Sequence, residues 1–345
     1  MKKKWLSNIV TMLASTFIML LVCELIIRFF FPQELAPVKF MYDKDMGLMH
    51  IPHLKGSEYY PGVYDFDFSN EENGFRTTHK GAVPDFINKK IMLIGDSFTY
   101  GKGVNDEETF AYRLQDYLLG DSTQVINAGV EGRGTDHALR CYQHYKDEYQ
   151  PNTVIYFSHF NDLADNMREE YYEIVNDSTL NIKTFEHALG GKKEVLRKSK
   201  LYNWLISNSH FFALIKKVLV QKLMSGQVVR YEDGIDMEKA KQLTAIYIDQ
   251  LRKEVEADGR KFIAYYIPAT NDIEARLKGE ITEQEQFFDN YFKEKNITFY
   301  NLSADFIDSG ETEILKHFYL LEGHWNPNGH QLAAEKLKTD AYGFY

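Results

Sequence analysis

The sequence predicts an α/β fold in which a parallel sheet of about five strands is flanked by helices. From Lys90 onward, strand-like and helix-like segments alternate, and this alternation is typical of parallel β-α-β units covered on both faces. Residues 91–94 (I-M-L-I) form an uninterrupted apolar run, as expected of a strand buried on both faces. With 345 residues, 44% of them hydrophobic, the chain has ample material for one large domain or two smaller ones.

Hydrophobic periodicity and turn residues give the expected position of each element. The expected strands are 91–94, 124–127, 153–157, 261–267 and 297–301. The expected helices are 107–119, 136–148, 237–257, 283–294 and 329–338.

Composition excludes several function classes. A net charge of −10 without a basic block argues against a nucleic-acid partner, although one local basic groove would still suit an acidic substrate. The only cysteines are Cys23, in an apolar stretch, and Cys141, so no intrachain disulfide is expected. No zinc-type Cys/His spacing and no phosphate-binding glycine loop occurs, and we expect no metal or organic cofactor.

The amino terminus indicates a membrane segment. Three lysines at 2–4 precede an apolar run at 5–31, and its nearly charge-free part, Trp5 to Cys23, is 19 residues long. About 20 apolar residues cross a bilayer, and flanking lysines favour the cytoplasmic side. We therefore expect 1–31 to be a transmembrane signal anchor of a single-pass protein, with the amino terminus cytoplasmic and the rest extracytoplasmic. The alternatives are a cleaved signal peptide, a lipoprotein modified at Cys23, and a buried amphipathic helix.

The remainder divides into a stem with a short β-rich extension at 32–89 and the α/β domain at 90–345. Within the extension we expect Arg76 to be structural; the alternative is a role in the substrate groove. An insertion at 165–236 interrupts the strand-helix alternation, with a hairpin at 171–182 and a helical stretch at 201–224. We interpret the insertion as a lid or groove wall. The alternative is a surface-packed subdomain or an element that lies along the membrane.

Four short blocks contain candidate catalytic residues. Ser97 follows Gly95-Asp96 at the end of the first expected strand, where ligands bind in open α/β sheets. A serine needs a base and oxyanion donors to act as a nucleophile. His324 lies in E-G-H-W-N, Gly132 in N-A-G-V-E-G, and Asn161 in H-F-N-D. Taken singly, Ser97 could equally be a turn serine or helix cap, and Gly132 a turn glycine.

Together and in this order, the blocks resemble the SGNH (GDSL-type) hydrolase superfamily. The resemblance implies a three-layer flavodoxin-like fold with strand order 2-1-3-4-5. It implies that Ser97 is the nucleophile, that His324 is the general base, and that the oxyanion hole is formed by Ser97, Gly132 and Asn161.

Two positions depart from the superfamily pattern. Leu321 stands where many members have the triad Asp, and His159 stands where Gly is usual. The H-W-N context is similar to the membrane-anchored branch of alginate-acetylation proteins, whose D-x-H pattern becomes Glu322-Gly323-His324 here. We therefore expect Glu322 to complete the catalytic triad.

These expectations describe a serine ester hydrolase or acyltransferase. The preferred prediction is a hydrolase that acts through an acyl-enzyme. Its substrates would be carboxylic esters, above all O-acetyl esters, of an extracytoplasmic polysaccharide or glycan. One alternative is an O-acetyltransferase that acetylates an exported polysaccharide and receives its acetyl group from an integral-membrane partner. Another is a non-catalytic polysaccharide-binding or assembly protein on the same fold. Trp325 could stack on sugar rings or belong to the core.

Overall fold

The computed structural model describes residues 2–81, 87–118, 122–167, 171–176, 179–185, 198–223 and 234–340. The chain divides into two compact units. The first contains Met1–Val38, Ser57–Asp65 and Lys192–Val228, and the second contains Lys39–Gly56, Phe66–Gly191 and Val229–Tyr345.

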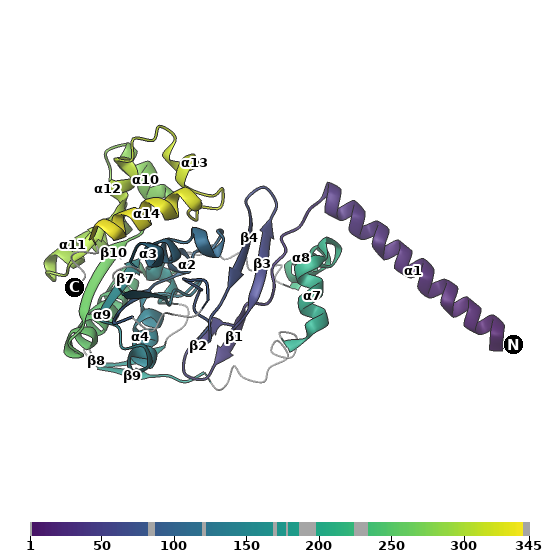
Figure 1. Cartoon of the computed structure of the whole chain (residues 1–345), viewed down its shortest axis with the longest axis horizontal. Coiled ribbons are helices and arrows are strands. Elements are labelled where there is room, and N and C mark those ends of the chain that lie inside the picture. Colours follow the sequence, from purple (N-terminus) through teal and green to yellow (C-terminus); the bar gives the residue numbers. More distant parts are fainter. Residues whose placement is uncertain are drawn as a thin grey trace. The chain divides into compact units, whose positions relative to one another are not determined.

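A parallel sheet of five strands forms the centre of the second unit (Figure 1). The strands are β5 (Lys89–Ile94), β6 (Thr123–Asn127), β7 (Thr153–Ser158), β10 (Lys261–Tyr266) and β11 (Phe299–Asn301). They are arranged in the order β6-β5-β7-β10-β11, which is 2-1-3-4-5 when the strands are counted along the chain. The predicted fold class and strand order are both confirmed.

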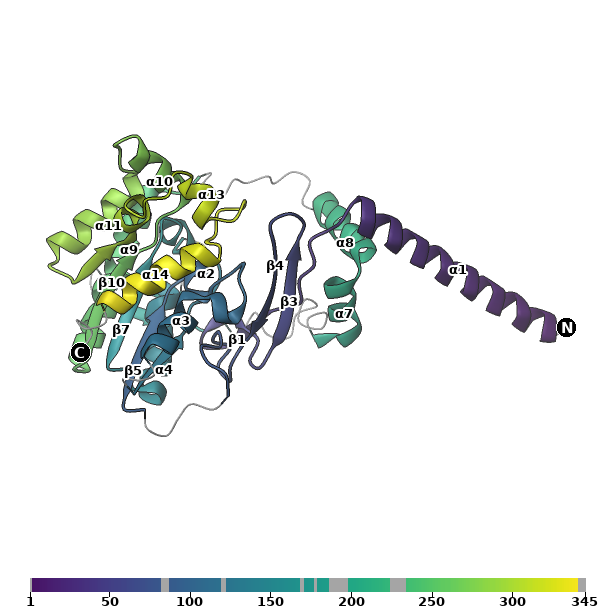
Figure 2. The same cartoon turned by 45° about the horizontal axis from the view of Figure 1, so that its top comes forward.

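Helices cover both faces of this sheet, because successive strand residues point to opposite sides. On one face, Met92 and Ile94 of β5 pack in an apolar cluster with α4 (Thr135–Tyr149), α9 (Met237–Ala257) and α11 (Glu283–Glu294). On the other, Ile91 and Leu93 pack in a second cluster. The helices of this second face are α3 (Phe110–Leu118), α10 (Thr270–Leu277), α12 (Leu302–Ile307), α13 (Ile314–Phe318) and α14 (Pro327–Asp340) (Figures 1 and 2). The result is a three-layer α/β arrangement.

The predicted helices 237–257 and 283–294 are found with those bounds, and the largest difference concerns 107–119. In its place a short 3₁₀ turn at Asp106–Glu108 is followed by α3, and residue 119 lies outside the described part of the chain. Thr109 separates the two because its backbone is extended and its Oγ1 accepts a hydrogen bond from the Tyr112 amide at 3.1 Å, which caps α3. The short helices α10, α12 and α13 were not predicted.

The extension before the sheet contains short antiparallel pairs. β1 (Phe40–Asp43) pairs with β2 (Gly47–His50), and β3 (Lys55–Tyr60) pairs with β4 (Tyr64–Ser69). Arg76, within the second unit, is fully buried and forms an ion pair with Asp106. Its guanidinium also donates to the carbonyls of Gly101 and Val104, at 3.2 and 2.8 Å. Arg76 therefore fixes the segment that follows the Ser97 turn, in agreement with its expected structural role.

The first unit contains α1 (Lys2–Phe30), α7 (Lys200–Asn208) and α8 (His210–Leu223). Residues Lys4–Phe30 of α1 have a mean hydropathy of 2.3 in their most apolar window, none of which is buried, so this helix is long and apolar enough to cross a membrane. The helical stretch expected at 201–224 is two helices, because Ser209 has an extended backbone and its Oγ accepts from the Phe212 amide. Met224 lies outside the described residues.

The predicted hairpin is also present, as the antiparallel strands β8 (Tyr172–Asn176) and β9 (Thr179–Ile182). It belongs to the second unit, whereas α7 and α8 belong to the first. The interval 165–236 is thus shared between two units, and a lid function stays a prediction.

Arg76→Met should lower the free energy of unfolding of the second unit by about 3–5 kcal/mol, because it leaves Asp106 and two carbonyls without their buried cation. Denaturant unfolding of wild type and of Arg76→Met measures this difference in the free energy of unfolding. Lys316→Met, which removes an exposed ion pair with Glu313, is the matched control and should cost at most about 1 kcal/mol. Equal losses in the two variants would contradict the structural role of Arg76.

Candidate active site

Ser97 lies where the central strands end. It is the first residue of α2 (Ser97–Tyr100), directly after β5 and the turn Gly95-Asp96. The Asp96 side chain accepts a hydrogen bond from the Phe98 amide at 2.9 Å and so caps this short helix. The first amides of a helix have no intrahelical partner, which makes the Ser97 N–H a donor suited to an oxyanion.

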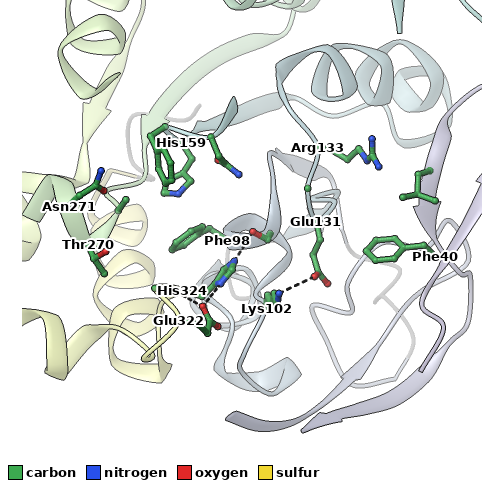
Figure 3. A pocket seen from close by; sticks show the side chains of 17 residues that line it. Phe40, Phe98, Lys102, Glu131, Arg133, His159, Thr270, Asn271, Glu322 and His324 are labelled. Atoms are coloured by element: carbon green, nitrogen blue, oxygen red, sulfur yellow. Dashed lines mark hydrogen bonds and ion pairs between the residues drawn. The ribbon is translucent and has the colours of Figure 1, made fainter. Parts of the chain in front are cut away.

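Three predicted residues form a chain of hydrogen bonds. Ser97 Oγ lies 2.8 Å from His324 Nε2, and His324 Nδ1 lies 2.7 Å from Glu322 Oε2 (Figure 3). Because a carboxylate accepts, Nδ1 carries the proton and Nε2 is left to accept from the serine hydroxyl. Burial alone would raise the pKa of Glu322, but the hydrogen bonds that it accepts from the ring and backbone of His324 outweigh burial and lower that pKa.

Glu322 reaches the imidazole because of Gly323. The backbone of Gly323 has φ of +102°, a left-handed conformation that residues with a Cβ rarely adopt. This reversal allows the Glu322 carboxylate to accept from both the backbone N–H of His324, at 2.9 Å, and its ring. Leu321, where the superfamily resemblance would place an Asp, is 87% exposed and takes no part in the hydrogen-bonded chain.

Backbone hydrogen bonds and buried aromatic residues fix the segment around His324. The Leu320 amide donates to the His324 carbonyl at 2.7 Å, and the Asn326 amide donates to the Phe318 carbonyl at 2.9 Å. Trp325 is fully buried against Phe306, so the expectation that it could stack on a sugar is wrong and it belongs to the core. Phe98 packs on the His324 ring, with centroids 4.8 Å apart. The imidazole therefore has one well-defined orientation.

Gly132 and Asn161 line the same pocket as Ser97. Gly132 has φ of +66° in the loop after β6, again a conformation that favours glycine. Asn161 follows β7 and directly precedes α5 (Asp162–Asp165), and its Nδ2 donates to Asp165 Oδ2 at 3.1 Å. An amide nitrogen has two hydrogens, so this bond fixes the orientation of the amide and leaves a second N–H for a ligand. The structure thus brings together all five predicted site residues.

The pocket has a volume of about 740 Å³ and is lined by further polar groups that sequence reasoning did not single out. They are Lys102, Glu131, Arg133, Thr270 and Asn271, together with the aromatic residues Phe40, Phe98 and Phe160 (Figure 3). Three of these, Phe98, Glu131 and Arg133, adjoin Ser97 or Gly132 in sequence, so their position beside the motifs was an available signal. Thr270 and Asn271 begin α10 and had no such signal.

His159, at the position where Gly is usual, is buried in this pocket wall. Its Nδ1 lies 2.8 Å from the Ile267 carbonyl oxygen, which can only accept, so Nδ1 carries the proton. Burial lowers the pKa of His159, which keeps the ring neutral and leaves Nε2 as an acceptor.

A buried ion pair fixes the loop that carries Gly132. Lys39 Nζ lies 2.6 and 2.8 Å from the two carboxylate oxygens of Glu131, and His50 Nε2 lies 3.5 Å away. Lys102 Nζ approaches the same carboxylate at 4.0 Å (Figure 3). Burial opposes ionisation of Glu131, but the charge of Lys39, the contact with His50 and the charge of Lys102 together outweigh burial and hold the pKa of Glu131 well below its ordinary range. The network connects the extension at Lys39 and His50 to the residue next to Gly132.

Within the residues that the structure describes, no group of three or more His, Cys, Asp or Glu side chains is arranged to hold a metal ion.

No protein-family model matches the sequence, and no curated protein matches it at a significant level. Several solved structures are similar in fold. A G-D-S-L family lipolytic protein from Desulfitobacterium hafniense is 16% identical, with 73% of this chain and 99% of that chain covered and a TM-score of 0.40. The esterase EstA from a Pseudoalteromonas species is 14% identical, with coverages of 74% and 98% and a TM-score of 0.38. An acetyl xylan esterase is 15% identical, with coverages of 72% and 98% and a TM-score of 0.39. Similarity at this distance does not assign an activity to the chain.

Glu131→Gln should destabilise the protein at pH 7 by about 3–5 kcal/mol, because Lys39 keeps its charge in a buried place and loses the Glu131 carboxylate. The folded pKa of Glu131 is depressed, so its contribution is present above the unfolded value of about 4.3 and is lost as the pH falls through the folded value. The difference in the free energy of unfolding between wild type and Glu131→Gln should therefore become smaller below about pH 4.

Urea unfolding from pH 7 to pH 3 measures this difference. Glu313→Gln, which breaks an exposed pair with Lys316, is the control and should differ little from wild type at any pH. A Glu131→Gln difference that stays constant with pH would contradict the ion-pair assignment.

Proposed function

We propose that the protein is a serine ester hydrolase of the SGNH type. The observation that carries this proposal is the continuous hydrogen-bonded chain from Ser97 through His324 to Glu322, open to a pocket that Gly132 and Asn161 also line. A hydroxyl, a correctly protonated imidazole and an ionised carboxylate at these distances are the arrangement that nucleophilic acyl transfer needs.

In the first half-reaction, Ser97 Oγ attacks the ester carbonyl carbon while His324 Nε2 takes the hydroxyl proton. Glu322 holds the Nδ1 proton and stabilises the imidazolium that forms. The carbonyl oxygen becomes an oxyanion that accepts hydrogen bonds from the backbone N–H groups of Ser97 and Gly132 and from Asn161 Nδ2. Collapse of this intermediate breaks the ester C–O bond, and His324 returns the proton to the leaving alcohol.

In the second half-reaction, His324 removes a proton from water, which attacks the carbonyl carbon of the acyl-enzyme. The bond between the acyl carbon and Ser97 Oγ then breaks, His324 returns the proton to Oγ, and the acid is released. An acceptor hydroxyl in the place of water would make the same residues an O-acetyltransferase. That alternative requires an acetyl donor, supplied by an integral-membrane partner.

For the substrate we propose O-acetyl esters of an extracytoplasmic polysaccharide. The support is the character of the pocket, where the carboxamides of Asn161 and Asn271 and the hydroxyl of Thr270 offer hydrogen bonds to a polyhydroxylated alcohol. His159 Nε2 adds an acceptor for a substrate hydroxyl.

For the location we propose a single-pass membrane protein, with α1 as signal anchor, a cytoplasmic amino terminus and an extracytoplasmic catalytic unit. The support is the length and hydropathy of α1 and the lysines at 2–4 that precede its apolar part. An anchored enzyme of this kind would act on glycans of the cell envelope.

Ser97→Ala and His324→Ala should each lower kcat for 4-nitrophenyl acetate by about 10⁴-fold or more, whereas the loss in Glu322→Ala should be roughly 10- to 100-fold smaller. The imidazole still accepts the serine proton without Glu322 but is less well oriented. Initial rates, with circular dichroism to confirm folding, measure these effects. Equal losses in Glu322→Ala and His324→Ala would contradict the assigned roles.

Two further readouts separate the alternatives. A serine-directed phosphonate should label wild type and not Ser97→Ala, and the absence of labelling in folded wild type would favour a non-catalytic binding or assembly protein. Mass spectrometry of added oligosaccharides, with an acetyl donor present, distinguishes hydrolysis from transfer, since only a transferase produces Ser97-dependent acetylated sugar.

Gly323→Ala should lower kcat by about 10- to 100-fold with a smaller effect on KM, because a Cβ disfavours the φ that lets Glu322 reach His324. Gly310→Ala is a matched control, because Gly310 has φ of +81° and equally open surroundings but lies away from the pocket. Both variants should lose similar stability, about 1–2 kcal/mol, and only Gly323→Ala should lose turnover. Parallel kinetic losses in the two variants would refute the positioning role.

A further inference from the structure

The helical pair α7–α8 is attached to α1 through the only charged residues inside the apolar run. Glu24 Oε2 accepts from Ser209 Oγ at 2.8 Å and from the Phe211 amide at 2.9 Å, and Oε1 accepts from the His210 amide at 3.1 Å. A carboxylate at the first amides of a 14-residue helix satisfies donors that have no intrahelical partner and interacts favourably with the helix dipole.

Arg28 completes this attachment. Its Nη2 donates to Glu24 Oε1 at 2.9 Å and to the Asn208 carbonyl, at the end of α7, at 2.7 Å. The Gln33 amide donates to His210 Nδ1 at 2.8 Å. The link between the two helices therefore lies against the last two turns of α1, and all of these residues belong to one compact unit.

If α1 crosses a bilayer, its length determines the depth at which Glu24 and Arg28 lie. From Trp5 to Cys23 the helix has 19 residues, which span about 28 Å at 1.5 Å per residue. This length is close to the hydrocarbon thickness of about 30 Å. Glu24 and Arg28 then lie at the level where the helix leaves the hydrocarbon, and α7 and α8 begin at the membrane surface.

The pair exposes large apolar side chains. On α7, Leu201 and Trp204 are 67% and 60% exposed, and they lie three residues apart on one face. On α8, the exposed Ile215, Val218 and Leu219 follow the i, i+3, i+4 spacing of a single helical face. Exposed apolar side chains gathered on two short helices mark an interaction surface.

Lysines accompany this apolar face. Lys216, Lys217 and Lys222 are exposed on α8, and α8 has no acidic residue. Apolar side chains beside lysines, with a tryptophan at their edge, are typical of helices that lie in the headgroup region of an anionic bilayer.

We propose that α7 and α8 form a membrane-surface element that inserts Leu201, Trp204 and Leu219 into the interface of the bilayer that α1 crosses. The proposal rests on α1 as a membrane anchor and is independent of the esterase activity. Glu24 and Arg28 serve as its docking residues. The protein is thereby attached to the bilayer by a second, reversible contact next to its anchor.

The test uses the full chain in vesicles of phosphatidylcholine and phosphatidylglycerol, with bromine atoms placed either near the headgroups or near the bilayer centre. Bromine quenches only tryptophans in contact with lipid. The difference between wild type and Trp204→Phe gives the emission of Trp204, and the difference between wild type and Trp5→Phe reports on α1. We expect Trp204 to lose emission, and to lose more with bromine near the headgroups.

Matched variants refine the test. Val218→Asp with Leu219→Asp should abolish Trp204 quenching while Trp5 stays quenched and small-ester hydrolysis is unchanged. The double variant Lys216→Glu with Lys217→Glu should weaken the quenching of Trp204 in vesicles that contain phosphatidylglycerol. In vesicles of phosphatidylcholine alone, the quenching of Trp204 should be unaltered.

Unquenched Trp204 with quenched Trp5 would overturn the proposal and mark the face as a protein-binding surface. If neither tryptophan is quenched, the membrane anchor fails as well.

Discussion

The site depends on the position of one strand, β5, between β6 and β7. In the hydrogen-bonded register Leu93 pairs with Asn127 of β6 on one side and with Ile155 of β7 on the other, so the three strands end at nearly the same level. The loops that follow them carry Ser97, Gly132 and Asn161. Ser97, Gly132 and Asn161 therefore line one pocket although Ser97 and Asn161 are 64 positions apart in sequence. The order of strands, rather than any local motif, brings them together.

The contact between Glu322 and His324 has a local geometric basis. Glu322 is two residues from His324, and an ordinary backbone between them would direct the longer side chain past the ring. The left-handed Gly323 turns the backbone so that the carboxylate returns to Nδ1 at 2.7 Å. The segment can hold this turn because Trp325 is buried behind it and the Leu320 amide closes it. The departure from the usual motif thus preserves the donor and acceptor pattern that the histidine needs.

Much of the fold and the core of the site could be predicted because their signals are local. The apolar run of β5, the glycines beside Ser97 and His324, and the Asn-Pro turn after His324 are all visible over a few residues of sequence. The Lys39–Glu131 pair could not be predicted, because its partners are 92 residues apart and nothing near either one indicates burial. The pocket residues Thr270 and Asn271 were missed for the same reason, since only the alignment of β10 beside β7 brings them to the site. For Trp325 the sequence left two alternatives open, a sugar platform and a core position, because an aromatic residue suits both, and the structure decides for the core.

The same distinction between local and distant partners explains the charges in the apolar amino-terminal helix. From the sequence alone, Glu24 and Arg28 mark only the end of the charge-free part of the apolar run, since a charge in hydrocarbon is costly. In the structure they pair with each other and also bind the end of α7 and the start of α8. Each backbone group that they bind is a helix-terminal donor or acceptor without an intrahelical partner. Glu24 and Arg28 therefore satisfy each other and the facing ends of α7 and α8. These contacts explain why a helical pair about 180 residues away in sequence lies against the end of the apolar run.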